Sequence, residues 1–316
     1  MGINHARVLH DNPRARLAAV VDADGPRAEA AAARFACRWF TSVDDLLAAV
    51  PIRAASVATP TAQHVEVASA LLQAGVDVLV EKPLAPSRAE ALGLCALAAE
   101  RGRVLMVGHI ERFNPAVRRL RELVVSGAFG DVTSIITRRV GLAPTRIKDA
   151  DVMTDLAVHD IDIANYLMGR LPVDVYAQGG RGLLRDRCDF AEIFLNYQTA
   201  NAIVSVNWLT PIKIRKLSIT GTRGYGELDF VRQELLLYQP PEADSFDGFP
   251  DFVSKYGQDR VISVPIEVSE PLRSELDHFL DCVESRQPPE CGCTEALAVL
   301  DILERAGRSS AGSDRT

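Results

Sequence analysis

The distribution of hydrophobic residues divides the chain into two parts. In the first part, short apolar runs alternate with amphipathic stretches of about 10–15 residues, a pattern typical of parallel strands joined by helices. The expected strands cover residues 17–21, 54–58, 76–80 and 104–107, and the expected helices cover residues 25–35, 42–50, 64–74 and 87–101. We therefore predict an α/β domain with a doubly wound parallel sheet.

The second part begins near residue 109, where apolar and polar residues start to alternate. Period-two alternation is typical of strands with one buried face. The expected strands cover residues 132–140, 174–178, 190–197, 202–207, 214–220, 226–230 and 234–238, and the expected helices cover residues 109–126 and 155–168. Gly169 stands where the second helix needs a C-cap. The pattern predicts an α+β domain with a large, mostly antiparallel sheet.

The end of the chain contains three segments that differ in composition and hydrophobic pattern. Residues 240–258 are rich in Pro, Asp, Gly and aromatic side chains, which predicts an extended loop. Residues 275–284 and 294–305 are helical in pattern and form a closing pair. The small, polar residues 307–316 predict a frayed, disordered tail.

Composition and charge exclude several classes of protein. The chain is 47% hydrophobic and 24% charged, as in ordinary globular proteins. Its net charge of -7 argues against a nucleic-acid binder, which needs a basic surface. No window approaches about 18 uninterrupted apolar residues, so we expect no membrane span. The first residues lack the pattern of a secretory signal, and we expect a cytoplasmic protein.

The six cysteines form no CxxC pair and no regular framework. Cys291 and Cys293 are the only close pair, and their spacing is poor for a structural zinc site. We therefore expect a reduced compartment with free, mostly structural thiols. Asp155 and His159 lack an obvious third ligand, so no metal site is predicted.

Polar residues follow several of the predicted parallel strands. Asp22, the pair Thr59-Pro60 and the pair Glu81-Lys82 each follow a strand, and His64 lies shortly after Pro60. In an open α/β sheet, ligands bind in the crevice beyond the carboxyl ends of the strands. The alternative for Glu81 and Lys82 is a solvated charge pair before the next helix. The alternative for His64 is a helix-start residue.

Asp155, His159 and Asp162 are spaced i, i+4 and i+7 on the predicted helix and share one face. An imidazole one turn from a carboxylate suits general acid–base chemistry near neutral pH. The alternatives are a first-turn Asp155 after a Thr154 cap and a satisfied core histidine. Arg112 and Asn114 are planar donors that suit a phosphorylated or hydroxylated substrate, or they mark a surface helix end.

Four motifs, in this order along the chain, carry a family resemblance. They are Ala58-Thr59-Pro60 with His64, Glu81-Lys82-Pro83, His109 with Arg112-Phe113-Asn114-Pro115, and Asp155 with His159-Asp160-Ile161-Asp162. The set resembles the Gfo/Idh/MocA family (glucose–fructose oxidoreductase / inositol dehydrogenase) from Gly2 to about Arg305. Residues 107–117 and 208–215 resemble members that oxidise UDP-N-acetylglucosamine at C3.

The resemblance implies an organisation and a set of roles. Residues 1–108 become a dinucleotide-binding Rossmann-type domain, and residues 109–306 become a substrate-binding and oligomerisation domain, with the helices near 275–305 packing back. The implied cofactor site, for NAD rather than NADP, consists of Gly2, Asp22, Thr59, Pro60, His64, Glu81 and Lys82. The implied catalytic residues are Lys82, His159 and Asp155. The implied substrate-binding residues are Arg112, Asn114, Asp162 and Lys213.

The implied reaction is NAD-dependent oxidation of a secondary hydroxyl on a sugar, with C3 of a UDP-N-acetylhexosamine as the leading substrate. Lys82 and His159 are both candidates for the base, and the sequence leaves that choice open. The Lys82-Pro83 bond is expected to be cis, as it often is in the family. The resemblance implies an enzyme that acts on a small-molecule substrate and assembles as a homodimer or homotetramer. The alternatives are another sugar or polyol dehydrogenase, such as an inositol enzyme, and a non-catalytic binder.

The start of the dinucleotide-binding pattern is unusual. Asp22 lies about 20 residues after Gly2, the spacing expected from the last glycine of a Rossmann fingerprint. The first strand and the earlier glycines of that fingerprint are absent from this sequence. We expect a start codon assigned too late, with a short apolar strand and Gly-x-Gly encoded just upstream in frame.

Overall fold

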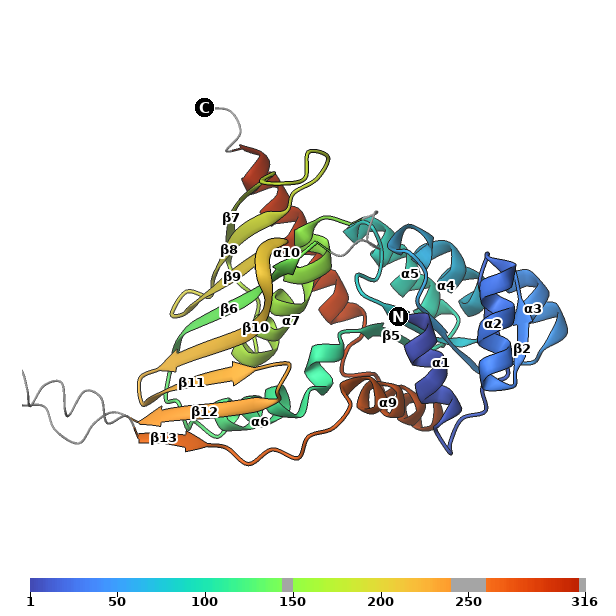
Figure 1. Ribbon diagram of the computed structural model, residues 1–316, viewed down its shortest axis with the longest axis horizontal. Helices are drawn as coiled ribbons and strands as arrows, with labels where there is room; N and C mark the ends of the chain where they lie inside the picture. Colours follow the sequence, from blue (N-terminus) through green and yellow to red (C-terminus); the bar gives the residue numbers. More distant parts are fainter. Residues whose placement is uncertain (144–149, 240–259, 313–316) are drawn as a thin grey trace, which may run out of the picture. The chain divides into compact units, whose positions relative to one another are not determined.

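The computed structural model describes residues 1–143, 150–239 and 260–312 (Figure 1). The chain forms two compact units. Unit 1 consists of Met1–Ile110 and Glu270–Glu304, and unit 2 consists of Glu111–Ser269 together with the end of the chain from Arg305. No helix of the described ranges is both long and apolar enough to cross a membrane.

Unit 1 contains short parallel strands in two sheets. One sheet pairs β1 (Ala19–Val21) with β2 (Arg38–Phe40), and the other has the order β3 (Ala54–Val57), β4 (Asp77–Glu81), β5 (Leu105–Gly108). In a doubly wound sheet, a further strand lies between β1 and β3. That strand is not among the described residues. The predicted Rossmann-type parallel arrangement is confirmed, while the three-residue strand β2 was missed.

Four helices of unit 1 begin and end close to the predicted positions: α2 (Gly25–Phe35), α3 (Val43–Ala49), α4 (His64–Gln73) and α5 (Arg88–Glu100). The unit also contains α1 (Gly2–His10), α9 (Pro271–Ser285) and a 3-10 turn η1 (Thr61–Gln63). Asp24, Ser42 and Ser87 each cap a helix by accepting a hydrogen bond from a backbone N–H three residues later.

Strand β4 runs through the centre of the unit 1 core. All five of its residues are buried, and Val78, Leu79 and Val80 are fully enclosed. Apolar residues of α4, α5 and the first turns of α10 (Cys293–Gly312) pack in the same cluster. Because both faces of β4 are covered, its carboxyl end is where the chain returns to the surface. Lys82, the next residue, is partly exposed.

Two cysteines correct the expectation of free thiols. Cys95 of α5 and Cys293 at the start of α10 form a disulfide between residues 198 positions apart in the sequence. Their spacing along the chain gave no signal of this pair. Cys37, Cys188 and Cys282 carry free thiols, as expected.

Unit 2 is built on one large sheet with the strand order β13-β12-β11-β10-β6-β9-β8-β7. The strands are β6 (Val132–Leu142), β7 (Asp174–Gly180), β8 (Phe190–Asn196), β9 (Asn201–Asn207), β10 (Leu209–Gly221), β11 (Gly224–Asp229), β12 (Glu234–Gln239) and β13 (Arg260–Ser263). Every neighbouring pair is antiparallel except β6 with β9, which confirms the predicted mostly antiparallel sheet. Strand β13 was not predicted.

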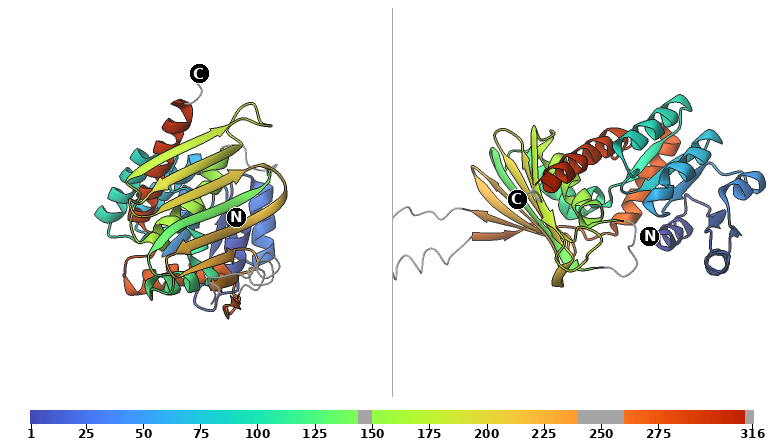
Figure 2. Two further views of the ribbon diagram at one scale, coloured as in Figure 1. Left: turned by 90° about the vertical axis from the view of Figure 1, so that its left-hand side faces the viewer. Right: turned by 90° about the horizontal axis from the view of Figure 1, so that it is seen from above.

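Helices α6 (Pro115–Val125) and α7 (Val158–Met168) lie on one face of this sheet, and the other face is open (Figure 2). Gly169 ends α7 in the left-handed conformation, as predicted. The helix expected over residues 109–126 is interrupted. A 3-10 turn η2 (Ile110–Phe113) precedes α6, because Asn114 adopts an extended conformation and caps α6.

The closing helices differ from the prediction mainly in length. Helix α10 begins in unit 1 and continues to Gly312 in unit 2, so the tail expected from residue 307 is helical as far as residue 312. The loop expected over residues 240–258 lies outside the described residues.

Candidate functional site

The carboxyl end of β4 holds a hydrogen-bonded chain of three side chains. Oε1 of Glu81 lies 2.9 Å from Nε2 of His5, and Nδ1 of His5 lies 2.8 Å from Oγ of Ser56. His5 comes from α1 and Ser56 from β3, so three elements of unit 1 meet here. The backbone N–H of Lys82 donates to the second oxygen of Glu81 at 3.2 Å. Glu81 is therefore fixed from both sides.

Glu81 is the negative charge of this cluster. Its side chain is only 8% exposed, and burial by itself raises the pKa of a carboxyl. The hydrogen bond and charge of His5, together with the charge of Lys82, outweigh burial and lower the pKa of Glu81 below its usual value. At neutral pH Glu81 is anionic beside the partly exposed Lys82.

His64 connects the turns that follow β3 and β4. Its Nδ1 lies 2.9 Å from the carbonyl oxygen of Pro83, and its Nε2 lies 3.0 Å from that of Thr59. Both partners are acceptors, so a ring that satisfies both must donate from both nitrogens. The peptide between Lys82 and Pro83 is cis, as expected. The structure thus brings together Thr59, His64 and the Lys82-Pro83 turn.

The remaining residues of the predicted cofactor site suit a dinucleotide. Oγ1 of Thr59 is buried without a hydrogen-bond partner among the described residues, so its hydrogen-bonding capacity is unused there. Helix α1 has no acidic residue in its first turn, which leaves the positive end of its dipole for phosphate. A Cβ at Gly2 would meet Ala58 at 3.8 Å, an ordinary contact, so space alone does not require glycine there.

Asp22 follows β1 and is partly exposed. One carboxylate oxygen accepts a hydrogen bond from the N–H of Asp24 at 3.0 Å, and the other lies 3.5 Å from Arg27. The exposed carboxylate retains acceptor capacity for a ribose hydroxyl. Pro60, next to Thr59, is exposed. These residues fit NAD, and their individual roles stay predictions.

The predicted catalytic helix of unit 2 is not a regular α-helix throughout. Residues Met153–Ala157 form a π-helical turn, η3, which continues into α7. Such wide turns are frequent at functional sites. Asp151 and Thr154 exchange hydrogen bonds between side chain and backbone N–H, so Asp151 rather than Thr154 caps the start of the helix.

Asp155 and His159 are partly exposed in a segment whose other residues are mostly buried. The insertion of a π-helical turn at Asp155 changes the angular relation that an i, i+4 α-helical spacing implies. The acid–base roles of both residues therefore stay predictions, carried by their exposure and chemistry rather than by an ideal helical face.

Two buried ion-pair systems anchor α7 to its surroundings in unit 2. Arg112 donates to both oxygens of Asp162, at 2.8 and 2.6 Å. Arg139 of β6 donates to Asp160 at 2.8 and 3.2 Å and to Glu111 at 2.7 Å. Burial lowers the pKa of Arg139, but the charges of Asp160 and Glu111 outweigh it and raise that pKa.

These contacts bear on three residues that we predicted to face the substrate. Arg112 and Asp162 are 7% and 1% exposed and bind each other. Asn114 is 1% exposed; its oxygen accepts from the N–H of Ala116, and its amide donates to the carbonyl of Phe230. The structure gives all three side chains partners within unit 2. Their substrate-binding role stays a prediction.

Strand β10 carries the last predicted residue and a cation that was not predicted. Lys213 is exposed. Arg215 is partly buried and donates to the carbonyls of Val140 and Ile214 at 2.6 and 2.8 Å. Burial and the nearby Arg139 lower the pKa of Arg215, and the charges of Asp160, Asp155 and Glu111 act in the opposite direction. Asp155 is thus one of three carboxylates that act on Arg215.

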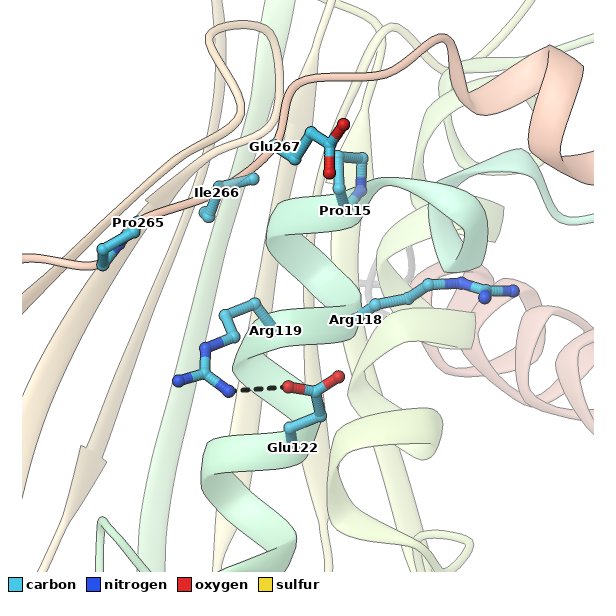
Figure 3. A pocket seen from close by; sticks show the side chains of 7 residues that line it. All are labelled: Pro115, Arg118, Arg119, Glu122, Pro265, Ile266 and Glu267. Carbon is cyan, nitrogen blue, oxygen red and sulfur yellow. Dashed lines mark hydrogen bonds and ion pairs between the residues drawn. The ribbon is translucent and has the colours of Figure 1, made fainter.

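A shallow pocket of about 250 Å³ lies between α6 and the segment 265–267 (Figure 3). Pro115, Arg118, Arg119, Glu122, Pro265, Ile266 and Glu267 line it. Arg119 donates to Glu122 across its floor at 2.7 Å. None of the predicted site residues line this pocket, so it is distinct from the chemistry described above. No cluster of three or more metal-ligating side chains occurs in the described part of the chain.

Sequence reasoning missed His5 and Ser56. His5 stands three residues after Gly2, on the face of α1 that also buries Ala6 and Val8. A histidine on the buried face of the helix predicted to bind phosphate is the signal that could have identified it. Nothing local marks Ser56, which is one of several small residues in a strand.

Two family models match the chain. The model of an oxidoreductase family with an NAD-binding Rossmann fold, GFO/IDH/MocA, matches residues 1–109. The model of the GFO/IDH/MocA C-terminal domain matches residues 117–227. The matched segments cover more than half of the chain and fall in different units.

Two curated relatives are similar over almost their whole length. The chain is 32% identical to the UDP-N-acetylglucosamine 3-dehydrogenase of Acidithiobacillus ferrooxidans over 304 residues, 95% of this chain and 92% of that protein. It is also 32% identical to the inositol 2-dehydrogenase of Rhizobium meliloti over 328 residues, 98% of this chain and 94% of that protein.

Solved structures have the same fold. UDP-N-acetylglucosamine 3-dehydrogenase GnnA from Acidithiobacillus ferrooxidans superposes with a TM-score of 0.85 at 30% identity, covering 98% of this chain and 94% of GnnA. GenD2 from gentamicin A biosynthesis, in complex with NAD, gives a TM-score of 0.83 at 28% identity, covering 99% of this chain and 92% of GenD2.

Proposed function

Since the chain belongs to the Gfo/Idh/MocA oxidoreductase family, we propose that it oxidises a secondary hydroxyl at C3 of a UDP-N-acetylhexosamine. Family membership confirms the predicted fold class and the predicted NAD-dependent oxidoreductase activity. The observation that carries the proposal is a lysine at the carboxyl end of a fully buried parallel strand, in a chain similar along its length to a UDP-N-acetylglucosamine 3-dehydrogenase.

The proposed reaction removes a hydride from carbon and a proton from oxygen. NAD, when bound, supplies the acceptor for the hydride. The chain must supply a base for the hydroxyl proton, and each unit offers one candidate, Lys82 in unit 1 and His159 in unit 2. We propose that Asp155 orients whichever of these two residues acts as the base. The N-terminus of α1 and the carboxylate of Asp22 are proposed to hold the phosphates and the adenosine ribose.

As the base, Lys82 would first have to lose a proton from its ammonium group, whereas a neutral His159 accepts a proton directly at a ring nitrogen. Lys82 can also act as an ammonium donor that polarises the hydroxyl while His159 takes the proton. The two assignments differ in the pH dependence that each variant should show.

The chemical test uses UDP-N-acetylglucosamine that carries deuterium at C3, with NAD as acceptor. The proposal expects the deuterium in the reduced cofactor and a 3-keto sugar nucleotide. Label retained in the sugar while reduced cofactor accumulates would refute oxidation at C3. A parallel series with myo-inositol and scyllo-inositol tests the second candidate, which the equal identity to an inositol 2-dehydrogenase supports.

Variants test the residue roles. Lys82→Ala and His159→Asn should each lower kcat by at least about 10²-fold, the usual scale of acid–base catalysis, with little change in NAD affinity. The exposed Lys216 and His10 provide matched controls as Lys216→Ala and His10→Asn. A variant that keeps the control's turnover would remove that residue from the catalytic set.

We also propose that the open sheet face of unit 2 mediates self-association. Tyr176, Phe194, Ile203 and Ile136 lie opposite one another on successive strands and form an apolar row across this face. Tyr176, Phe194 and Ile136 are 56%, 40% and 46% exposed. Ile136→Glu should lower the mass seen by sedimentation equilibrium, whereas Leu92→Glu, at an exposed leucine of α5, should not.

A further inference from the structure

Glu275 of α9 is a buried carboxyl to which the proposed function assigns no role. Its side chain is completely enclosed, and neither of its oxygens has a hydrogen-bond partner among the described residues. An ionised carboxylate in such a position loses its hydration without compensation. A group in this situation keeps its proton instead of its charge.

Glu81 is the charged group that acts on Glu275. Burial, followed by the negative charge of Glu81, raises the pKa of Glu275 well above its usual value. Other charged side chains of α1, α9 and their flanking residues form ion pairs with one another. Arg7 pairs with Glu270, Arg14 with Asp281 and Glu284, and Arg286 with the buried Asp77 of β4. Asp277 accepts a hydrogen bond from the amide of Asn12, and Arg273 donates to the carbonyl of Asp11.

We infer that Glu275 is a positioning residue that stays protonated at neutral pH and so keeps Glu81 paired with His5 and Lys82. An ionised Glu275 would place a second negative charge beside Glu81 in the core of unit 1. It would also leave a buried charge without a hydrogen-bond partner on α9, the helix that contacts α1. The neutral acid avoids both effects.

A consequence for catalysis rests on the proposed function. Glu81 places one negative charge beside Lys82. An ionised Glu275 would add a second negative charge to the same cluster. The proton on Glu275 thus keeps the charge around the proposed catalytic lysine at that of a single carboxylate.

The protonation state can be measured without substrate or cofactor. In protein labelled with ¹³C at the glutamate carboxyl carbon, the resonance missing from the spectrum of Glu275→Gln belongs to Glu275. It should keep the chemical shift of a neutral acid through pH 7, whereas the carboxyl of a glutamate model peptide titrates at about pH 4.3. Titration of the Glu275 resonance in the same pH range as the model peptide would overturn the inference.

Thermal stability gives a second measurement. A carboxyl whose pKa is raised on folding stabilises the folded state only at low pH, and this contribution is lost as the pH rises through the folded-state pKa. Glu275→Gln lacks the titrating carboxyl and so avoids this loss. The Tm of the variant minus the Tm of wild type should therefore increase by at least about 2 °C when the pH is raised from about 5 to about 8. Glu29→Gln, at an exposed position of α2, should show no such trend. A constant Tm difference would contradict the inference.

The pH profile of turnover separates positioning from a purely structural role. Wild type should lose kcat/KM as Glu275 ionises at alkaline pH, whereas Glu275→Gln should keep it there. Profiles that run parallel at every pH would refute the positioning role. If Glu275→Gln fails to fold, Glu275→Met supplies a neutral side chain of similar length. Lack of activity with every substrate would refute the proposed function and leave the spectroscopic and thermal results intact.

Discussion

The Arg112–Asp162 pair allows a direct choice between a structural and a substrate-binding role. The informative change is Asp162→Asn, which preserves shape and removes the charge. Both side chains are almost completely buried, and the two hydrogen bonds of 2.8 and 2.6 Å are bidentate. The guanidinium also lies 4.9 Å from the ring centroid of Tyr166. Arg112 therefore loses its anionic partner in a place that water does not reach.

Breaking one side of a buried ion pair costs about 3–5 kcal/mol, because the remaining charge is left without compensation. The amide oxygen of the introduced asparagine still accepts one hydrogen bond, which places the expected loss near the lower end, about 3 kcal/mol. For a domain of this size, each kcal/mol corresponds to about 2–4 °C in Tm. The melting temperature should fall by about 6–12 °C.

The assay combines thermal unfolding with steady-state kinetics below the transition. A structural pair predicts the loss of Tm together with an unchanged KM for the nucleotide sugar in the folded variant. Asp174→Asn, at an exposed aspartate of β7, is the control for removal of one negative charge. The double variant Arg112→Met with Asp162→Leu should recover much of the lost stability. An unchanged Tm with a raised KM would instead place this pair at the substrate.

Three further predictions concern other parts of the fold. Cys95→Ser, or reduction of the disulfide between Cys95 and Cys293, should lower the unfolding free energy by about 2–5 kcal/mol in denaturant titrations. Equal stability with and without reductant would show that the bond is not formed. Burial raises the pKa of Asp189, but hydrogen bonds from three backbone N–H groups outweigh burial and lower this pKa overall. The ionised Asp189 therefore stabilises the folded state above about pH 4, and this contribution is lost as the pH falls through the folded-state pKa. Asp189→Asn should lose about 1–3 kcal/mol at neutral pH and little in acid, and a pH-independent loss would contradict this assignment. A Cβ at Gly108 would lie 3.2 Å from the backbone of Glu81. Gly108→Ala should therefore lower the unfolding free energy by about 1–3 kcal/mol and reduce turnover. Unchanged kinetics and stability would show that Glu81 can move without consequence.

Features encoded over a few neighbouring residues were predictable from the sequence. Ser42 caps α3, Gly169 ends α7 in the left-handed conformation, and buried β4 delivers Glu81 and Lys82 to a strand end. Each follows from a local rule: a capping side chain, a residue without Cβ, or a continuous apolar run. The fold class followed from the same rules, applied repeatedly.

Partnerships across long stretches of sequence were not predictable. His5 and Glu81 are 76 residues apart, and Arg112 and Asp162 are 50 apart. No periodicity connects such positions, because a hydrogen bond between distant elements depends on how those elements pack. The π-helical turn at Met153–Ala157 was missed for a related reason, since one inserted residue leaves the hydrophobic pattern almost unchanged.

The same distinction sharpens the set of candidate residues. A charged side chain in a sequence motif suggests a ligand-binding residue. Burial decides whether that side chain instead pairs with another group of the protein. Arg112, Asn114 and Asp162 are at most 7% exposed and have hydrogen-bond partners within unit 2. Lys82 and His159 are partly exposed beside buried groups. In the proposed assignment, the buried charges hold the scaffold and the partly exposed charges perform the chemistry, so only variants of the second kind should change kcat without changing stability.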